Sequence, residues 1–150
     1  MEKMKINKNF IILITKEKEF FNIELETALM SNFLKNLYFQ FRKESNEDLI
    51  IPLYNVETKV LTKIIEYCRY QKNFSSIKDF SKYRDSDFYQ KCDWNIEFFK
   101  VNKHMIVDMI NAAFYLDIKD LLKYATETIA NSFVITMDNY QKTNKFFIKK

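Results

Sequence analysis

The chain has 150 residues, of which 47% are apolar and 29% charged, and its net charge at neutral pH is +4. This composition is that of a folded globular domain and excludes a disordered chain. Glycine is absent. Phosphate-binding loops, dinucleotide-binding motifs and nucleophile elbows are therefore excluded, because each needs glycine where the backbone turns sharply or approaches a ligand.

No stretch approaches the roughly 20 apolar residues of a membrane span, and the apolar run 10–14 is too short for a secretory leader. We therefore expect a soluble intracellular protein with no membrane partner. The net positive charge comes from residues 142–150, which hold four lysines and no acid, so residues 1–141 have no net charge. A nucleic-acid partner is not expected either, because such proteins carry a basic stripe on the fold itself.

Residues with catalytic or metal-binding chemistry are few. Cys68 and Cys92 are the two cysteines and form no CxxC pair, and His104 is the single histidine. Cys68 falls in an apolar helical stripe and is predicted to be a core residue, whereas His104 is predicted to lie on a helix surface. The sequence therefore predicts no enzyme, no cofactor and no metal site.

The N-terminal third is predicted to contain strands and one helix. The apolar run 10–14 and the alternating stretch 20–25 predict a hairpin, whose turn lacks the usual glycine and is expected to be strained. Residues 26–42 have helical spacing of apolar residues and a good N-cap in Ser31. Residues 49–53 predict a third strand, and Pro52 predicts that this strand lies at an edge or ends there.

The rest of the chain is predicted to be helical around one long loop. Asn55 is the predicted cap of a helix to residue 71, and residues 72–93 have no periodicity and are predicted to be a mobile surface loop. Further on, the sequence predicts a short turn over residues 95–100 and three helical segments. These are 102–115, capped by Asn102, then 117–133, capped by Asp117, and a last segment capped by Thr136.

This order of elements predicts an α+β fold, in which a small three-stranded sheet is covered by helices. Residues 1–116 are predicted to form the sheet-containing domain and residues 117–150 a C-terminal helical extension. We find no internal repeat and no low-complexity tract.

Several stretches resemble the S-phase kinase-associated protein 1 family. They are residues 51–56, 60–68 and 93–101, and above all Ala112-Ala113-Phe114-Tyr115-Leu116-Asp117-Ile118-Lys119-Asp120-Leu121-Leu122 with residues 128–131. The resemblance spans about residues 10 to 135. It implies a BTB/POZ fold with a C-terminal helical extension, and a non-catalytic adaptor of the cytoplasm and nucleus that links a cullin to F-box proteins in an SCF-type ubiquitin ligase.

The resemblance also implies two groups of site residues. Phe114 and Tyr115 stand where the family faces the cullin. Helical spacing alone favours a core role for the apolar residues of the last helices. The resemblance instead implies an F-box-facing set: Ile106, Ile110, Leu122, Ile129, Phe133 and Tyr140.

The chain departs from the family at several points. Lys18 replaces the glycine of the hairpin turn, and Phe114 replaces the usual asparagine before Tyr115. The family's terminal F-box-clasping segment has no counterpart before Lys150, so we expect the extension to be truncated and F-box binding to be weakened. Two alternatives to the adaptor stay open: a truncated competitor that binds one partner and blocks ligase assembly, and a homo-oligomeric BTB scaffold, which leaves a homodimer among the partners.

Overall fold

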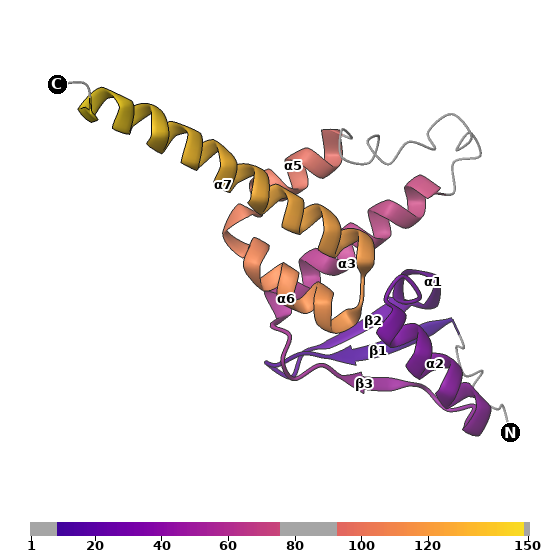
Figure 1. Cartoon of the computed structure of the whole chain (residues 1–150). Helices are drawn as coiled ribbons and strands as arrows, with labels where there is room; N and C mark the ends of the chain where they lie inside the picture. The colour runs from indigo at the N-terminus through magenta and orange to yellow at the C-terminus, as the bar shows by residue number, and fades with distance from the viewer. Residues whose placement is uncertain (1–8, 76–92, 149–150) are drawn as a thin grey trace, which may run out of the picture.

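The computed structural model describes residues 9–75 and 93–148, with a small sheet at one end and a long helix leaving the other (Figure 1). Its strands confirm the α+β class and the predicted hairpin. The elements in chain order are β1 Phe10–Ile14, β2 Phe20–Glu24, α1 Leu25–Ala28, α2 Asn32–Glu44, β3 Ile50–Pro52, α3 Thr58–Ser75, α5 Asp93–Val101, the 3-10 helix η2 Lys103–Met105, α6 Ile106–Leu116 and α7 Lys119–Ile148.

The sheet has the strand order β2-β1-β3, so the first strand is the central one. β1 pairs antiparallel with β2, where Ile12 lies opposite Asn22, and parallel with β3, where Ile12 lies opposite Ile50. Pro52 lies at the end of β3, an edge strand, as the sequence predicts. There its missing N–H costs the sheet no ladder hydrogen bond.

The turn between β1 and β2 is built without glycine, and one of its residues is in the left-handed region. Lys18 has φ 64°, which brings its Cβ close to the backbone and costs roughly 1 kcal/mol or more for a residue with a side chain. Its N–H donates to the carbonyl of Thr15 at 2.9 Å. The strain expected from the sequence is therefore present at this lysine.

The single helix predicted over residues 26–42 is divided in two. Ser31 is the N-cap of α2, and its hydroxyl accepts the N–H of Leu34 at 3.2 Å. A residue that caps α2 has an extended backbone (φ −86°, ψ 118°), so α1 ends before it and the two helices take different directions. The helical periodicity of the sequence continues across this break, which is why the pattern did not predict it.

The helix α3 begins at Thr58, two residues later than a cap at Asn55 predicts, and Asn55 is not its cap. The carboxylate of Glu17, from the β1–β2 turn, accepts both the backbone N–H and the hydroxyl of Thr58, each at 2.9 Å. The helix also runs on to Ser75, so residues 72–75 are helical rather than part of a loop. The remainder of the loop predicted over 72–93, with Cys92, lies outside the described residues apart from Asp93, where α5 begins.

Three further predictions about caps are wrong. Asn102 does not cap a helix: its side-chain amide donates back to the carbonyl of Phe98 at 2.8 Å and ends α5, which is a full helix rather than a short turn. Asp117 ends α6 in the left-handed conformation (φ 52°) instead of starting α7. Thr136 does not begin a separate helix, because α7 is one helix of 30 residues that extends away from the body (Figure 1).

The core lies between one face of the sheet and the helices α3 and α6. Ile11 and Leu13 come from β1 and Leu53 comes directly after β3, and each is fully buried against helical residues such as Ile64 and Met109. Cys68 is buried in this core, as predicted, and burial raises the pKa of its thiol to about 12. Among the described residues, no helix has the length and apolar character to span a membrane.

Candidate protein-interaction surface

The helix α6 has an inner and an outer face that differ sharply in exposure. Met109 and Ala113 are fully buried, whereas Val107 is 62% and Phe114 75% exposed, with the half-buried Ile110 between them along the outer face. Val107, Ile110 and Phe114 follow the i, i+3, i+7 spacing of one helical face. The outer face of α6 therefore presents a continuous apolar stripe to solvent.

Ile106 is a correction to the predicted F-box-facing set, because its side chain is 3% exposed and belongs to the core. The residue next to it, Val107, holds the surface position that the sequence reasoning missed. Helical spacing alone does not separate the two residues. Val107 lies two turns before Phe114 on the same face, so its position follows only once Phe114 is known to be exposed.

The end of α6 is fixed by α2. The hydroxyl of Ser31 donates to the carbonyl of Leu116 at 2.5 Å, and the N–H of Asn32 donates to the carbonyl of Asp117 at 3.2 Å. Both bonds satisfy carbonyls at a helix C-terminus, which have no partner within the helix. They hold the last turn of α6, with Phe114 and Tyr115, in a defined position over α2.

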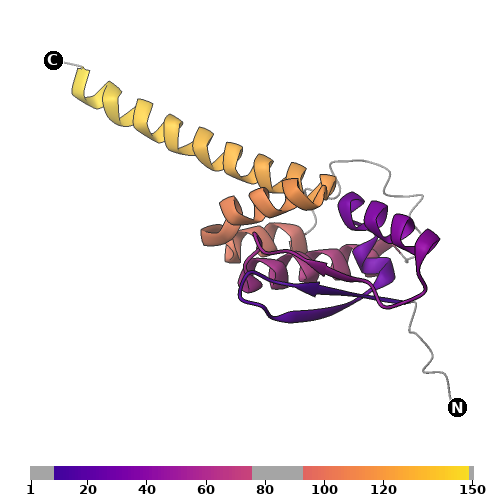
Figure 2. The same ribbon diagram turned by 90° about the horizontal axis from the view of Figure 1, so that it is seen from below.

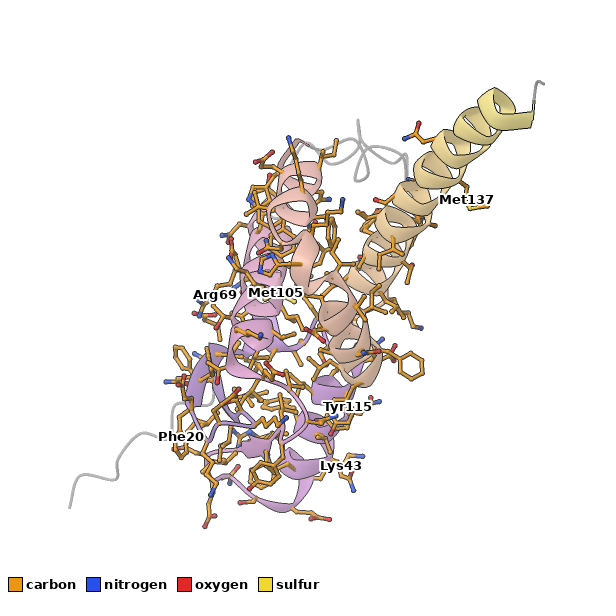
Figure 3. The ribbon with its side chains drawn as sticks, turned by 90° about the vertical axis from the view of Figure 1, so that its left-hand side faces the viewer. Phe20, Lys43, Arg69, Met105, Tyr115 and Met137 are labelled. Carbon is orange, nitrogen blue, oxygen red and sulfur yellow. The ribbon has the colours of Figure 1, made fainter. Side chains whose placement is uncertain are left out.

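Tyr115 is 39% exposed and rests against α2 on one side only. Its ring is 5.0 Å from that of Phe33, centroid to centroid, with the two planes tilted by 46°. Figure 3 shows Tyr115 where the helices of the C-terminal half meet the N-terminal elements. A tyrosine that is supported by another ring and partly open to solvent is a typical interface anchor, because it buries a large area and loses little side-chain entropy.

The first turns of α7 add two apolar side chains to this surface. Leu122 is half-buried and Ile129 is 37% exposed, and the two residues are seven positions, or two turns, apart on one face. With Val107, Ile110 and Phe114 they define what we call the α6–α7 surface. Phe133 and Tyr140, the other two predicted F-box-facing residues, have side chains outside those that the structure describes.

The opposite face of α7 borders a groove that is lined by both apolar and polar side chains. A cavity of about 410 Å³ lies between α5 and α7, with Ile96 and Phe99 on one wall and Tyr124 on the other. Lys100 and Glu127 are among the charged residues at this groove. Because successive helical residues are rotated by about 100°, this groove and the side chains of Leu122 and Ile129 face opposite ways.

In the part of the chain that the structure describes, no group with catalytic geometry accompanies these surfaces. Within the described ranges, no three acidic, histidine or cysteine side chains gather in a way that suits a metal ion. His104 is exposed in η2, as predicted. The described geometry is that of a surface for binding other proteins, with exposed aromatic and aliphatic residues on a rigid helical pair.

Comparison with known proteins agrees with this geometry. Residues 9–73 match the family described as "Skp1 family, tetramerisation domain". The chain is 32% identical over 123 residues to the SCF ubiquitin ligase complex protein SKP1b of Dictyostelium discoideum, covering 82% of this chain and 74% of that protein. The chain belongs to the Skp1 family.

Two further relatives support this membership. The SKP1-like protein 4 of Arabidopsis thaliana is 33% identical over 130 residues, which cover 83% of this chain and 75% of that protein. The E3 ubiquitin ligase complex SCF subunit sconC of Talaromyces stipitatus is 36% identical over 115 residues, which cover 73% of this chain and 68% of the relative. The resemblance read from the sequence is thereby confirmed.

Membership of the Skp1 family identifies the fold as a BTB/POZ fold. The matched residues 9–73 include the whole three-stranded sheet and the helices α1, α2 and most of α3. The α6–α7 surface lies after this match, in the helices that follow residue 73. Proteins of the Skp1 family are adaptor subunits, so this chain is not an enzyme.

Proposed function

We propose that this Skp1-family chain is a non-catalytic adaptor that links a cullin scaffold to F-box substrate receptors in an SCF-type ubiquitin ligase. The names of two relatives, an SCF ubiquitin ligase complex protein and an E3 ubiquitin ligase complex SCF subunit, support the assignment to this kind of complex. The proposal places the protein in the cytoplasm and nucleus.

One observation carries the proposal: a single helical pair exposes two adjoining groups of interface residues. Phe114 and Tyr115, at the end of α6, are the proposed cullin-facing residues. Ile110, Leu122 and Ile129 are proposed to receive the F-box, with Val107 added from the structure. An adaptor needs two surfaces that are occupied at once, and rigid hydrogen bonds from α2 to α6 keep their relative position fixed.

Phe114 and Tyr115 are expected to contribute to binding in different ways. Phe114 is 75% exposed, so a partner that covers it buries most of a phenyl ring. Tyr115 is already supported by Phe33, so little ordering is required when a partner covers its free side. Interface anchors of this kind typically account for about 2 kcal/mol or more of binding free energy.

The experiment is reconstitution with a purified cullin N-terminal domain and a purified F-box domain. The adaptor proposal expects a ternary complex, and it expects Tyr115→Lys to weaken cullin binding by about 30-fold, which corresponds to roughly 2 kcal/mol. Phe39→Lys is the control, because Phe39 is a similarly exposed ring on α2, 50% accessible and six residues beyond Phe33, the ring that contacts Tyr115. Binding of one partner that excludes the other would contradict the adaptor role and indicate a competitor.

A further inference from the structure

The face of the sheet that is turned away from the core carries apolar side chains that no described element covers. Along β1, Ile11 and Leu13 point into the core and are fully buried. Successive residues of a strand point to opposite faces, so the half-buried residues between and beside these two point outward. Figure 2 shows the described helices gathered on the other side of the three strands. We call the outward-pointing residues the outer sheet face, and its apolar members are Phe10, Ile12, Ile14, Phe20, Ile50 and Pro52.

The outer sheet face has the composition of a surface that another element covers. Phe20 is 70% and Ile50 50% exposed. A sheet with one solvated face normally alternates apolar and polar residues along each strand. The strand β1 is instead apolar at all five positions, and its neighbour Asn22 in β2 is polar but uncharged. The sequence of β1 is therefore that of a strand with an apolar partner on each side.

A hollow in this face suits one basic side chain of a partner. It has a volume of about 80 Å³ and is lined by Phe10, Ile12, Asn22 and Asp48. A lysine or arginine packs its aliphatic stem against apolar side chains and keeps its charged end at a polar group. Here Phe10 and Ile12 offer the apolar wall and the Asp48 carboxylate offers the opposite charge. The start of β1 is therefore the acidic end of the outer sheet face.

The other end of the face, at the β1–β2 turn, is basic. Thr15 is buried, and its N–H donates to the carbonyl of Glu19 opposite at 3.0 Å, so Glu19 shares the core side of the sheet with Thr15. The carboxylate of Glu17 is also held on that side, because it accepts the N–H of Thr58. Lys16 follows Thr15, is exposed, and by the same alternation lies on the outer side.

One α-helix lying along β1 matches this face in size and in charge. Three strands spaced by about 4.8 Å, with five residues of about 3.4 Å each in β1, span roughly 10 Å by 17 Å. An α-helix is about 10 Å across, and three turns are about 16 Å long. A helix is partly positive at its N-terminus and partly negative at its C-terminus, which complements Asp48 at one end and Lys16 at the other. A β-strand has only a small dipole and gains less from these two charges.

We propose that the outer sheet face binds one amphipathic helix of another protein, whose N-terminus lies at Asp48 and whose C-terminus lies at Lys16. A lysine or arginine near the start of that helix enters the hollow beside Asp48. The sheet then has helices on both faces, which is a common layered arrangement. The outer sheet face and the α6–α7 surface share no residue, so this partner is additional to those of the proposed adaptor role. Interfaces of this small area bind weakly, so we expect micromolar affinity.

Selection from a phage-displayed library of helical peptides of about 14 residues tests the proposal, with the full chain as target. The variant Phe20→Lys serves for counter-selection, so that peptides bound elsewhere on the chain are removed. The recovered peptides are expected to have apolar residues at i, i+3, i+4 and i+7 and a lysine or arginine in the first turn. Circular dichroism shows whether Phe20→Lys keeps its fold. If no peptide depends on Phe20, or if the recovered peptides bind in an extended form, the proposal is overturned.

Two further variants locate the bound helix by fluorescence anisotropy of a recovered peptide. Ile50→Lys, on β3, is expected to lower the affinity by about 10-fold. Asp48→Asn is expected to lower it by about 3-fold, and only for a peptide that keeps its basic first-turn residue. Phe114→Lys is the matched control, because Phe114 is 75% exposed on α6, and it should bind as the parent does. Equal losses in Ile50→Lys and Phe114→Lys would overturn the assignment to the sheet. A peptide affinity that falls as the protein concentration rises would mean that a second copy covers the face, and it would overturn the proposal too.

Discussion

Glu17 and Thr58 join the hairpin turn to the start of α3, although 41 residues separate them in the chain. One carboxylate oxygen of Glu17 accepts both the backbone N–H and the hydroxyl of Thr58 at 2.9 Å. The same hydroxyl is 2.7 Å from that of Thr15, at the end of β1. A carboxylate at this place satisfies an N–H that has no partner within the helix and lies at the positive end of the helix dipole.

This geometry predicts that Glu17→Gln lowers the melting temperature of the protein and does so in a pH-dependent way. The Thr58 N–H, with the Thr58 hydroxyl, lowers the pKa of Glu17 from its usual 4.5. The stabilisation is therefore fully present above pH 4.5 and is lost as the pH falls through the lower value of the folded state. Thermal unfolding of both proteins from neutral pH into acid should show two curves that converge at the acid end. Glu19→Gln is the control, and an equal effect of that variant would contradict the role of Glu17.

Lys18 predicts a stabilising substitution in the same turn. Because its φ of 64° is costly for a side-chain-bearing residue and free for glycine, Lys18→Gly should raise the free energy of unfolding. The extra flexibility of glycine in the unfolded chain offsets part of this gain, and we expect a net of about 0.5–1 kcal/mol in urea unfolding.

Lys16→Gly is the matched control for this prediction. Lys16 lies in the same turn but is not among the described residues with positive φ. Glycine there should only add flexibility to the unfolded chain and therefore lower stability. If both substitutions change the free energy of unfolding in the same direction, the backbone of Lys18 is not the cause.

Ser31 predicts a destabilising substitution at the junction of α2 and α6. Ser31 is buried, with 3% of the residue exposed. Its hydroxyl caps α2 by accepting the N–H of Leu34, and it donates to the carbonyl of Leu116. Ser31→Ala removes both bonds and leaves the carbonyl buried, which should cost about 1–3 kcal/mol of unfolding free energy. Ser45→Ala is the control near the other end of α2, where the hydroxyl makes an exposed local bond, and it should change stability by less than about 0.5 kcal/mol.

The strands and the buried faces could be predicted from the sequence, because local patterns determine them. β1, β2 and the edge position of Pro52 followed from apolar runs, alternation and the missing N–H of proline. The caps of α3 and α7 could not be predicted this way. The group that binds the N-terminus of α3 is the carboxylate of Glu17, which is distant in the chain. Asp117 adopts a left-handed backbone conformation, which the local sequence pattern does not predict.

The candidate site shows the same division between local pattern and tertiary context. The exposed Tyr115 and Ile129 were named from the resemblance, but the choice between Ile106 and Val107 depends on how α6 is rotated against α3. Both are apolar and adjacent, so helical periodicity alone does not decide which one faces the core. That rotation is fixed by packing, and only the structure gives it.

Cys68 predicts slow thiol chemistry in the folded protein. Burial raises the pKa of this thiol to about 12, so almost no thiolate forms at mildly alkaline pH. In a Cys92→Ser background, alkylation at that pH should be slow in buffer and fast in urea. A raised pKa also means that the unfolding free energy falls as the pH rises from the unfolded value near 9.0 toward about 12. Rapid alkylation of the native protein would contradict the buried position.

The last prediction concerns the proposed F-box side of α7. Ile129 is exposed on the face that it shares with Leu122, so Ile129→Lys should leave the fold intact and place a charge in the proposed interface. We expect its affinity for an F-box domain to fall by about 30-fold in calorimetry, the equivalent of roughly 2 kcal/mol. Asn131→Lys is the control, because two residues further along the helix the side chain is rotated by about 200° and lines the groove on the opposite face. An unchanged affinity for Ile129→Lys together with a loss for Asn131→Lys would move F-box binding from the α6–α7 surface to the groove between α5 and α7.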